Sequence, residues 1–365
     1  MKKRIILRIK DFTGFMLLLL AVGLLSTCSK SDEPEIFVPT LYMHGMAQTG
    51  GNGVISFGGI NYDKMDNLTY HYHPELNEWN TVETSVMPHA RSQFGMCYGG
   101  NNTAVIYGGW YNQDINNYQS GYLMYGDTWE YDLSNETWEE IDIEGQIPGK
   151  RRWSAMAYAG NNAVVLFGGD LLYSINGSEI NTVLSNDTWV YYVDSNKWEP
   201  VSSTPSPGKR AYHMMAYAGE NNVMLFGGVF WETDNPYNYA DTWEFDVSAK
   251  QWTKIQNTGE YPSGRNNAAL SYAGNDKILL FGGNISPAGA YEYVNETWEY
   301  NIQNKTWDKI TFSGDMPPAT IHHKLAYGGN GNVYLHGGVG TASTGSIWEY
   351  NCSEKHWKEL LRQTG

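Results

Sequence analysis

Short apolar runs that stop at paired glycines recur along most of this chain. The run at residues 163–167 is apolar throughout, which is typical of a strand with both faces buried. Such runs end in a glycine pair six times, at spacings of 50, 60, 59, 55 and 55 residues. A period of this length predicts one structural unit stacked six times. The pairs are Gly58-Gly59, Gly108-Gly109, Gly168-Gly169, Gly227-Gly228, Gly282-Gly283 and Gly337-Gly338.

An alternating pattern follows the glycine pairs. Trp129, Tyr131 and Leu133 lie on one face of residues 128–133 and polar side chains on the other, which predicts a half-buried strand. Two aromatic positions nine residues apart recur after each pair, and they hold eleven of the fourteen tryptophans. These positions are Tyr70/Trp79, Trp129/Trp138, Trp189/Trp198, Trp243/Trp252, Trp298/Trp307 and Trp348/Trp357.

Each unit therefore predicts four antiparallel strands, named a to d in chain order. Strand a is rich in small residues, a turn such as 160–162 leads into the apolar strand b, and strands c and d hold the two aromatic positions. Trp252 and Ile255 are three residues apart, as are Trp307 and Ile310, so a bulge or twist is expected in strand d. Six such sheets predict an all-β fold, a six-bladed β-propeller.

An Arg/Pro frame precedes the strands. With the glycine and tryptophan positions, this frame resembles the Kelch family over about residues 41–361. The resemblance implies blades at about 41–87, 88–147, 148–206, 207–261, 262–316 and 317–361. The first departs most, with Leu41, Gln48 and Tyr70 in place of Arg, Tyr and Trp. Seventeen residues before each first glycine stand Leu41, Arg91, Arg151, Arg210, Arg265 and Thr320, all but the first preceded by proline at three residues' distance.

Ring closure is expected to depend on packing. Every repeat begins with strand a and ends with strand d, so no strand is left over to join the last blade to the first. Residues 36–38 offer only a short edge strand because Pro39 follows. The blade at 317–361 should therefore pack directly on the blade at 41–87.

The first 27 residues predict an export signal. Basic residues precede an apolar run at 15–25, which is shorter than the roughly 20 residues that span a bilayer. Residues 25–28 resemble the lipobox of bacterial lipoproteins, which implies lipidation of Cys28; ordinary signal cleavage nearby is the alternative. Residues 28–40 then form an acidic tether similar to the export tag of surface lipoproteins. These features predict a lipid anchor in the bacterial cell envelope, at the outer membrane or cell surface.

Charge narrows the classes of partner. The chain has 24 Lys and Arg against 39 Asp and Glu, a formal net charge of -15. This acidic balance argues against nucleic acid, whose binding needs clustered Lys and Arg to neutralise phosphates. Three cysteines exclude a disulfide scaffold, and the histidines of one repeat position, His44, His213 and His323, form no recognisable metal set. The sequence therefore predicts no nucleic-acid partner, no metal, no cofactor, and membrane contact only through the lipid.

The connections between strands b and c vary most in length, and variable connections often carry function. The long ones span residues 110–126, 170–187, 229–241 and 284–296 and are rich in Tyr and Trp. Trp110 and Trp231 lie in them, and Trp153 is expected just under the same face. Rings on one rim suit the flat apolar faces of sugars or peptides; packing of the connections onto the propeller is the alternative.

Arg91, Arg151, Arg210 and Arg265 are the other candidates for ligand contact. The Kelch resemblance places them near the channel mouth on the same face, where guanidinium groups can hold a carboxylate or another anion. A structural role is the alternative, with bonds to backbone carbonyls or stacking on an aromatic ring.

These patterns predict a binding module that recognises a glycan or a protein through the aromatic connections. Residues 210–213 resemble a stretch that carries copper ligands in galactose oxidase, also a Kelch propeller, but the rest of that copper site has no recognisable counterpart. An enzyme similar to the sialic-acid mutarotases, acting on an anionic sugar, is one alternative. An architectural component of an envelope complex is another.

Overall fold

The computed structural model describes residues 37–62, 64–115, 122–176, 179–286, 291–329, 331–341 and 345–363, without the side chains of 173–180. These ranges are almost entirely β-strand, with one 3-10 helix at Val193–Ser195 and no α-helix. The predicted signal peptide, Cys28 and most of the predicted tether lie outside them. In the same ranges, no helix has the length and apolar character needed to cross a membrane.

Six antiparallel sheets of four strands make up most of the described chain. Each sheet takes its strands from one repeat in chain order, so the predicted all-β architecture of four-stranded repeats is confirmed. The third sheet also includes the short β14 (Arg151–Arg152). The first three sheets are β2 (Gly45–Gln48), β3 (Val54–Phe57), β6 (Thr69–His73) and β7 (Glu78–Val82); β8 (Gly95–Gly100), β9 (Thr103–Tyr107), β12 (Thr128–Asp132) and β13 (Thr137–Glu140); and β15 (Ala155–Gly160), β16 (Ala163–Asn176), β17 (Glu179–Tyr192) and β18 (Lys197–Val201). The last three are β19 (Met214–Tyr217), β20 (Asn222–Phe226), β23 (Thr242–Asp246) and β24 (Gln251–Ile255); β25 (Ala269–Gly274), β26 (Lys277–Phe281), β27 (Thr297–Asn301) and β28 (Thr306–Ile310); and β30 (Lys324–Tyr327), β31 (Asn332–His336), β33 (Ser346–Asn351) and β34 (His356–Arg362).

Short strands pair on the side of the b–c connections. They form separate two- and three-stranded ribbons beside the main sheets. These strands are β1 (Leu41–Tyr42), β4 (Ile60–Asn61) and β5 (Lys64–Met65); β10 (Trp110–Tyr111) and β11 (Leu123–Met124); β21 (Val229–Phe230) and β22 (Tyr237–Asn238); and β29 (Thr320–Ile321) and β32 (Val339–Gly340).

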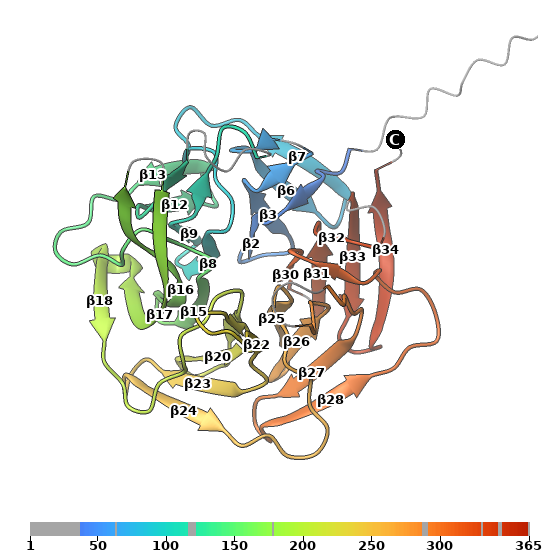
Figure 1. Cartoon of the computed structure of the whole chain (residues 1–365). Helices are drawn as coiled ribbons and strands as arrows, with labels where there is room; N and C mark the ends of the chain where they lie inside the picture. Colours follow the sequence, from blue (N-terminus) through green and yellow to red (C-terminus); the bar gives the residue numbers. More distant parts are fainter. Residues whose placement is uncertain are drawn as a thin grey trace, which may run out of the picture. The chain divides into compact units, whose positions relative to one another are not determined.

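The six sheets are arranged around a common centre, with strand a innermost and strand d outermost (Figure 1). The innermost strands contact one another in the cyclic order β2, β8, β15, β19, β25, β30 and back to β2. The apolar side chains of strands b pack between neighbouring sheets. In β26, for example, four of the five residues are buried. The hydrophobic core is therefore divided among the interfaces between sheets.

The glycine pairs join each repeat to the next. The amide of Gly109 donates to the carbonyl oxygen of Arg151 in the following repeat at 2.8 Å. A Cβ atom on Gly108 would lie 2.7 Å from that same oxygen, so no side chain fits there. Both glycines also have positive φ, 70° and 96°. The pair is therefore required by the close approach of two backbones.

The same bond closes the ring. Gly338 of the last repeat donates to the carbonyl oxygen of Leu41 in the first at 2.9 Å. Val38 donates its amide to the side-chain oxygen of Gln363 at 2.9 Å, and Val38 packs with Ile347 in one buried cluster. No strand is exchanged between the first and last sheets within the described ranges. Closure thus combines the expected packing with backbone hydrogen bonds that the sequence analysis did not predict.

A tryptophan attaches strand d of most repeats to the preceding sheet. The indole Nε1 of Trp252 donates to the hydroxyl of Thr188, on strand c of the sheet before it, at 2.9 Å. At the interface between the last and first repeats, Ile347 replaces the threonine, and Nε1 of Trp79 has no hydrogen-bond partner among the described residues. The five bonds are Trp138–Thr69, Trp198–Thr128, Trp252–Thr188, Trp307–Thr242 and Trp357–Thr297.

One detail of the sequence predictions was wrong, and a second holds in only some of the repeats. The connection at 170–187 is mostly hairpin, because β16 and β17 continue through it as paired strands. The bulge expected in strand d is absent from β24, which pairs continuously with β23 over five residues, but present in β34, where the register with β33 shifts at Leu360. Trp252 and Ile255 are both buried, and their three-residue spacing places them on opposite faces of β24.

The substitution Thr188→Val tests the tryptophan bonds. It leaves the fully buried Nε1 of Trp252 without an acceptor, which should lower the free energy of unfolding by about 1–3 kcal/mol, measured by urea denaturation. Thr253→Val, at an exposed position of β24, is the matched control and should change little. Equal losses in the two variants would show that the bond contributes nothing.

Candidate functional site

A channel runs between the six innermost strands. Four cavities follow one another along it, because consecutive cavities share lining residues. The mouth cavity, on the side of the b–c connections, has a volume of about 460 Å³. The collar cavity and the inner cavity beneath it measure about 70 and 100 Å³, and the tyrosine cavity at the opposite mouth about 280 Å³.

A closed circle of backbone hydrogen bonds, the collar, surrounds the channel below the mouth cavity. Each repeat contributes the residue two positions after its Arg position, and its amide donates to the collar carbonyl of the preceding repeat at 2.8–3.2 Å. None of the six is glycine, yet all have positive φ, which the hydrogen bonds hold in place. The collar residues are Met43, Gln93, Trp153, Tyr212, Asn267 and His322.

The three tryptophans outside the repeat positions all line the mouth cavity. Trp153 belongs to the collar, Trp110 begins β10, and Trp231 follows β21 directly. The rings of Trp153 and Trp231 meet edge to face with centroids 5.7 Å apart. Trp110 is buried, while Trp153 and Trp231 are half-buried. The short strands of the b–c connections thus bring together rings that the sequence analysis selected but could not place relative to one another.

Arg152, which the sequence analysis did not select, is the charged side chain that lines the mouth cavity. Its guanidinium lies 3.7 Å from the ring centroid of Trp153 and 5.6 Å from that of Trp110, a cation–π arrangement. Its Nε donates to Asp170 at 3.1 Å. Burial raises the pKa of Asp170 above its ordinary value even with Arg152 beside it. The cation is therefore held in a fixed position among the indoles.

Asparagines form the opposite wall of the mouth cavity. Asn267 donates to the side-chain oxygen of Asn266 at 2.6 Å, and Asn266 donates to that of Asn238 at 2.8 Å. No carboxylate is among the described residues that line this cavity. The titratable His322 is uncharged at neutral pH, because burial lowers its pKa to about 3. The described walls combine flat aromatic rings, side-chain amides and one guanidinium group, which suit a ligand with flat apolar faces and hydrogen-bonding groups.

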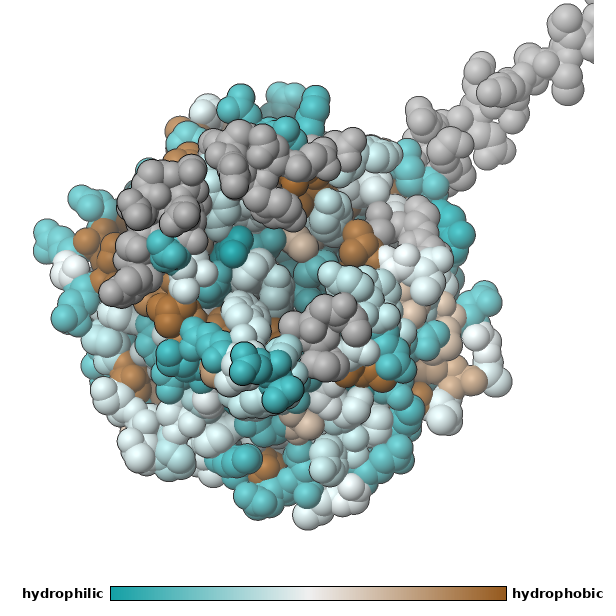
Figure 2. Space-filling model, in the orientation of Figure 1, coloured by the Kyte–Doolittle hydropathy of each residue, from teal (hydrophilic) through white to brown (hydrophobic). Residues whose placement is uncertain are grey.

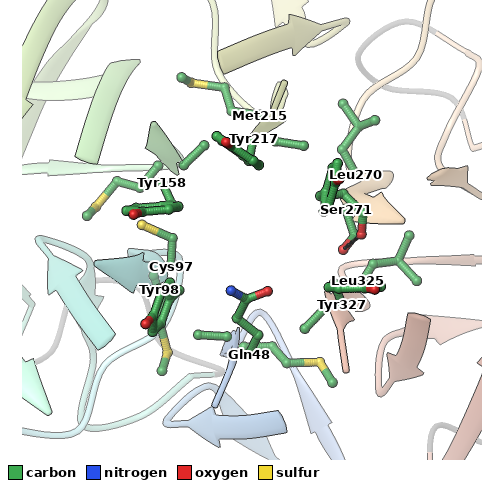
Figure 3. Close-up of a pocket in the computed structure, with 18 of the residues that line it drawn as sticks. Gln48, Cys97, Tyr98, Tyr158, Met215, Tyr217, Leu270, Ser271, Leu325 and Tyr327 are labelled. Atoms are coloured by element: carbon green, nitrogen blue, oxygen red, sulfur yellow. Dashed lines mark hydrogen bonds between the residues drawn. The ribbon is translucent and has the colours of Figure 1, made fainter. Parts of the chain in front are cut away.

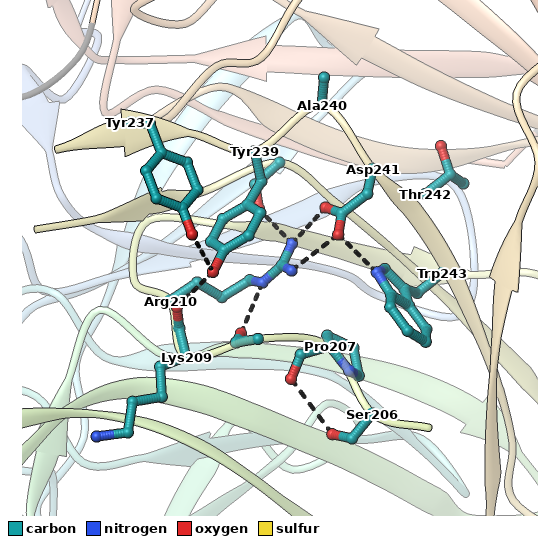
Figure 4. A network of polar contacts seen from close by, with 12 residues as sticks. Ser206, Pro207, Lys209, Arg210, Tyr237, Tyr239, Ala240, Asp241, Thr242 and Trp243 are labelled. Carbon is teal, nitrogen blue, oxygen red and sulfur yellow. Dashed lines mark hydrogen bonds and ion pairs between the residues drawn. The ribbon is translucent and has the colours of Figure 1, made fainter. Parts of the chain in front are cut away.

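The four candidate arginines lie inside the structure and not in this cavity. Nη1 and Nη2 of Arg210 bind Asp241 at 2.7 and 3.0 Å, and Nε donates to the carbonyl of Gly208 at 3.0 Å (Figure 4). Asp241 also accepts from Nε1 of Trp243 at 2.8 Å. The ring of Tyr239 covers the guanidinium at 3.7 Å. Burial opposes the ionisation of Asp241, but the hydrogen bonds and charge of Arg210 outweigh it and lower the pKa.

The same arginine–carboxylate–indole unit recurs in the neighbouring repeats. All four guanidinium groups are at most 1% exposed, so they have no open surface for a ligand. This geometry favours the structural role that the sequence analysis left open beside anion binding. The other three units are Arg91–Asp127–Trp129, Arg151–Asp187–Trp189 and Arg265–Glu296–Trp298.

The two partners of this unit are present or absent together. The first repeat has Leu41 and Leu68 at the two positions, and the last has Thr320 and Ser346. A lone buried charge would be costly, which accounts for their joint loss. This pairing could have been predicted from the sequence. The carboxylate position lies two residues before the first aromatic position of every repeat, and it is acidic only in the repeats that have the arginine.

The opposite mouth carries a ring of strand-a tyrosines, shown in Figure 3. Neighbouring rings lie with centroids 5.3–5.6 Å apart. The hydroxyl of Tyr98 accepts from the amide of Asn102, and that of Tyr327 from the amide of Gly331, so these hydroxyls stabilise the a–b turns. The ring consists of Tyr98, Tyr158, Tyr217, Tyr272 and Tyr327, with Gln48 in the sixth place.

Metal ligands do not gather in the described chain. No group of three or more His, Cys, Asp or Glu side chains in the described ranges is placed to hold an ion. His213 and His323 are buried near the channel, and burial lowers the pKa of each to about 3. Nε2 of His323 lies 3.1 Å from the carbonyl oxygen of Phe281, a structural contact.

The substitution Arg210→Leu should destabilise the fold. It leaves Asp241 without its partner, and the expected loss is about 3–5 kcal/mol in the free energy of unfolding. Adding Asp241→Leu reproduces the Leu41/Leu68 pair of the first repeat and should recover most of that loss. Urea denaturation measures the free energy of unfolding of both variants. Unchanged stability of Arg210→Leu would contradict the structural role of the arginine and favour a role in ligand binding.

Comparison with known proteins agrees with the repeat pattern. A sequence model of the KLHDC2/KLHL20/DRC7 Kelch-repeats domain matches residues 28–169 and 169–365. Kelch domain-containing protein 10 of Homo sapiens is 25% identical over 288 residues, which cover 75% of this chain and 61% of that protein. The leucine-zipper-like transcriptional regulator 1 homolog of Drosophila melanogaster is 23% identical over 231 residues, which cover 62% of this chain and 22% of that protein. The chain thus spans at most about three fifths of these two relatives. Because the matched residues include every repeat, the chain belongs to the family of Kelch-repeat proteins.

Proposed function

We propose that this chain is a six-bladed Kelch propeller, lipid-anchored through Cys28 outside the inner membrane of a bacterium, that binds a glycan or a protein in the mouth cavity. The observation that carries the proposal is the convergence of Trp110, Trp153 and Trp231 on one cavity with Arg152. The three tryptophans come from three different repeats, and none of them occupies a position that the repeat requires. The collar, with one residue from each of six repeats, supports six blades.

The form of the mouth cavity supports binding. Its volume of about 460 Å³ lies within the range of small-molecule sites and accommodates a sugar ring or a protruding side chain. The face seen in Figure 2 is largely hydrophilic, with hydrophobic residues in separate small patches. A broad apolar docking surface is therefore not the basis of the proposal. Recognition depends instead on the cavity and on rim residues such as Tyr291, which is 75% exposed.

A glycan array tests the mouth cavity. Glycans bound by the protein should lose affinity by about tenfold or more in Trp231→Ala, measured by calorimetry, because stacking on the indole is removed. Tyr62→Ala is the control, since Tyr62 is an exposed aromatic residue outside the cavity. For a protein ligand, a photo-crosslinking residue at position 231 should capture the partner and one at position 62 should not. Equal binding by Trp231→Ala and the unchanged protein would exclude this cavity.

Incorporation of labelled palmitate tests the lipid anchor. The chain expressed in a bacterium should incorporate the label and fractionate with membranes, and Cys28→Ala should abolish both. Cys97→Ala is the control, because burial raises the pKa of the Cys97 thiol and keeps it unreactive. Labelling that persists in Cys28→Ala would contradict the proposed anchor.

A further inference from the structure

The channel contains one lysine at a position where every other repeat has a small or apolar residue. Lys324 is the first residue of β30 and pairs with His336, directly before the last glycine pair. The lysine is therefore a departure specific to the last repeat and not a requirement of the fold. The equivalent residues, each opposite the residue before its own glycine pair, are Gly45, Gly95, Ala155, Met214 and Ala269.

Lys324 lies where the channel narrows below the collar. It is half-buried and lines both the collar cavity and the inner cavity, so its side chain reaches the channel. The methionines Met46, Met96 and Met156 line the inner cavity beyond it. The ammonium group is therefore reached through the mouth cavity and collar on one side and is backed by apolar side chains on the other.

This ammonium group has no counter-charge. None of the described residues forms an ion pair or hydrogen bond with it. The titratable groups that act on it or share its cavities are His44, His213, His322 and His323, and burial lowers the pKa of all four below its ordinary value. They are uncharged at neutral pH. Burial also lowers the pKa of Lys324 to about 8, which still leaves most of the population protonated at pH 7.

Two further hydrogen-bond donors line the same space. The hydroxyl of Ser154 and Nε1 of Trp153 are buried and have no partner among the described residues. Ser154 lines both cavities with Lys324, and Trp153 lines the collar cavity. Buried donors without partners are costly, and an anion bound in these cavities would accept hydrogen bonds from them and balance the charge of Lys324.

We propose that Lys324, with Ser154 and Trp153, forms an anion site below the collar that receives the carboxylate of a ligand whose remainder occupies the mouth cavity. The second half of this inference rests on the proposed binding function; the anion site itself does not. Volumes of about 70 and 100 Å³ admit a carboxylate, and the mouth cavity of about 460 Å³ offers the larger space, among the indoles, for the ring of such a ligand. The charge that selects the anion is thus supplied by Lys324 and not by the buried frame arginines.

Matched acids and neutral analogues test the ligand class. Calorimetry of the protein with glucuronate against glucose, and with benzoate against benzamide, separates a sugar acid from an aromatic acid. At least one acid should bind, its neutral analogue should not, and Lys324→Met should weaken the acid by about tenfold or more. Methionine is chosen because Met214 occupies the equivalent place in β19. Lys358→Met, at an exposed position of β34, should leave binding unchanged.

A second measurement does not depend on any ring-bearing ligand. In protein labelled with 13C at lysine Cε, one NMR signal should titrate near pH 8 and be absent from Lys324→Met. Acetate should raise that midpoint, because a bound anion favours the charged amine, and acetate affinity should fall as the pH rises through it. A midpoint that acetate does not move, with equal acid binding by Lys324→Met and the unchanged protein, would overturn the anion site. An acetate effect together with full acid binding by Trp231→Ala would retain the anion site and reject the mouth cavity.

Discussion

One backbone hydrogen bond determines how the repeats meet: the second glycine of each pair donates to the carbonyl at the Arg position of the following repeat. It recurs six times at 2.8–3.0 Å and returns from Gly338 to Leu41. The bond explains why the first glycine of each pair is required, since a Cβ atom on it would collide with the accepting oxygen. It also fixes the main chain two residues before the collar. The glycine pairs, the buried arginines and the channel mouth are therefore parts of one arrangement.

Much of the fold was readable from the sequence because its signals are local and repeated. Apolar strands b, alternating strands c and the spacing of Trp129 and Trp138 each report on a neighbouring strand of the same sheet. The contacts between repeats were less accessible, because the partner of Gly338 is almost 300 residues away. The hairpin at 170–187 was missed although the sequence carried signals for it: residues 173–176 alternate apolar and polar, and Asn176-Gly177 is a sequence typical of two-residue hairpin turns.

The site was readable only in part. Trp110, Trp153 and Trp231 were selected because they lie outside the repeat register, and the structure brings them to one cavity. The arginines were selected for their charge, but the structure surrounds that charge with carboxylates and indoles. Arg152 and Lys324 were missed, because the role proposed for each depends on its neighbours in space. A sequence does not show which side chains surround a charge or whether that charge has a partner.

The interface between the last and first repeats is built differently from the other five. It lacks the bond from tryptophan to threonine, and the buried ion pair is absent from both flanking repeats. Contacts of the chain ends replace them, including Nε2 of His336 against the carbonyl of Pro39 at 2.8 Å and Val38 against Gln363. Stability at this interface therefore depends on residues at the two extremes of the described chain. Loss of either end would remove contacts that the other five interfaces do not need.

The collar allows the side chains around the channel to vary without affecting the formation of the ring. Its hydrogen bonds use only main-chain atoms, so the six side chains that it presents around the channel are not needed for ring formation. The repeats of this chain have already diverged to methionine, glutamine, tryptophan, tyrosine, asparagine and histidine at that place. Substitution at these six positions, one per repeat, therefore changes the lining of the channel while the main-chain bonds that hold the repeats together stay the same.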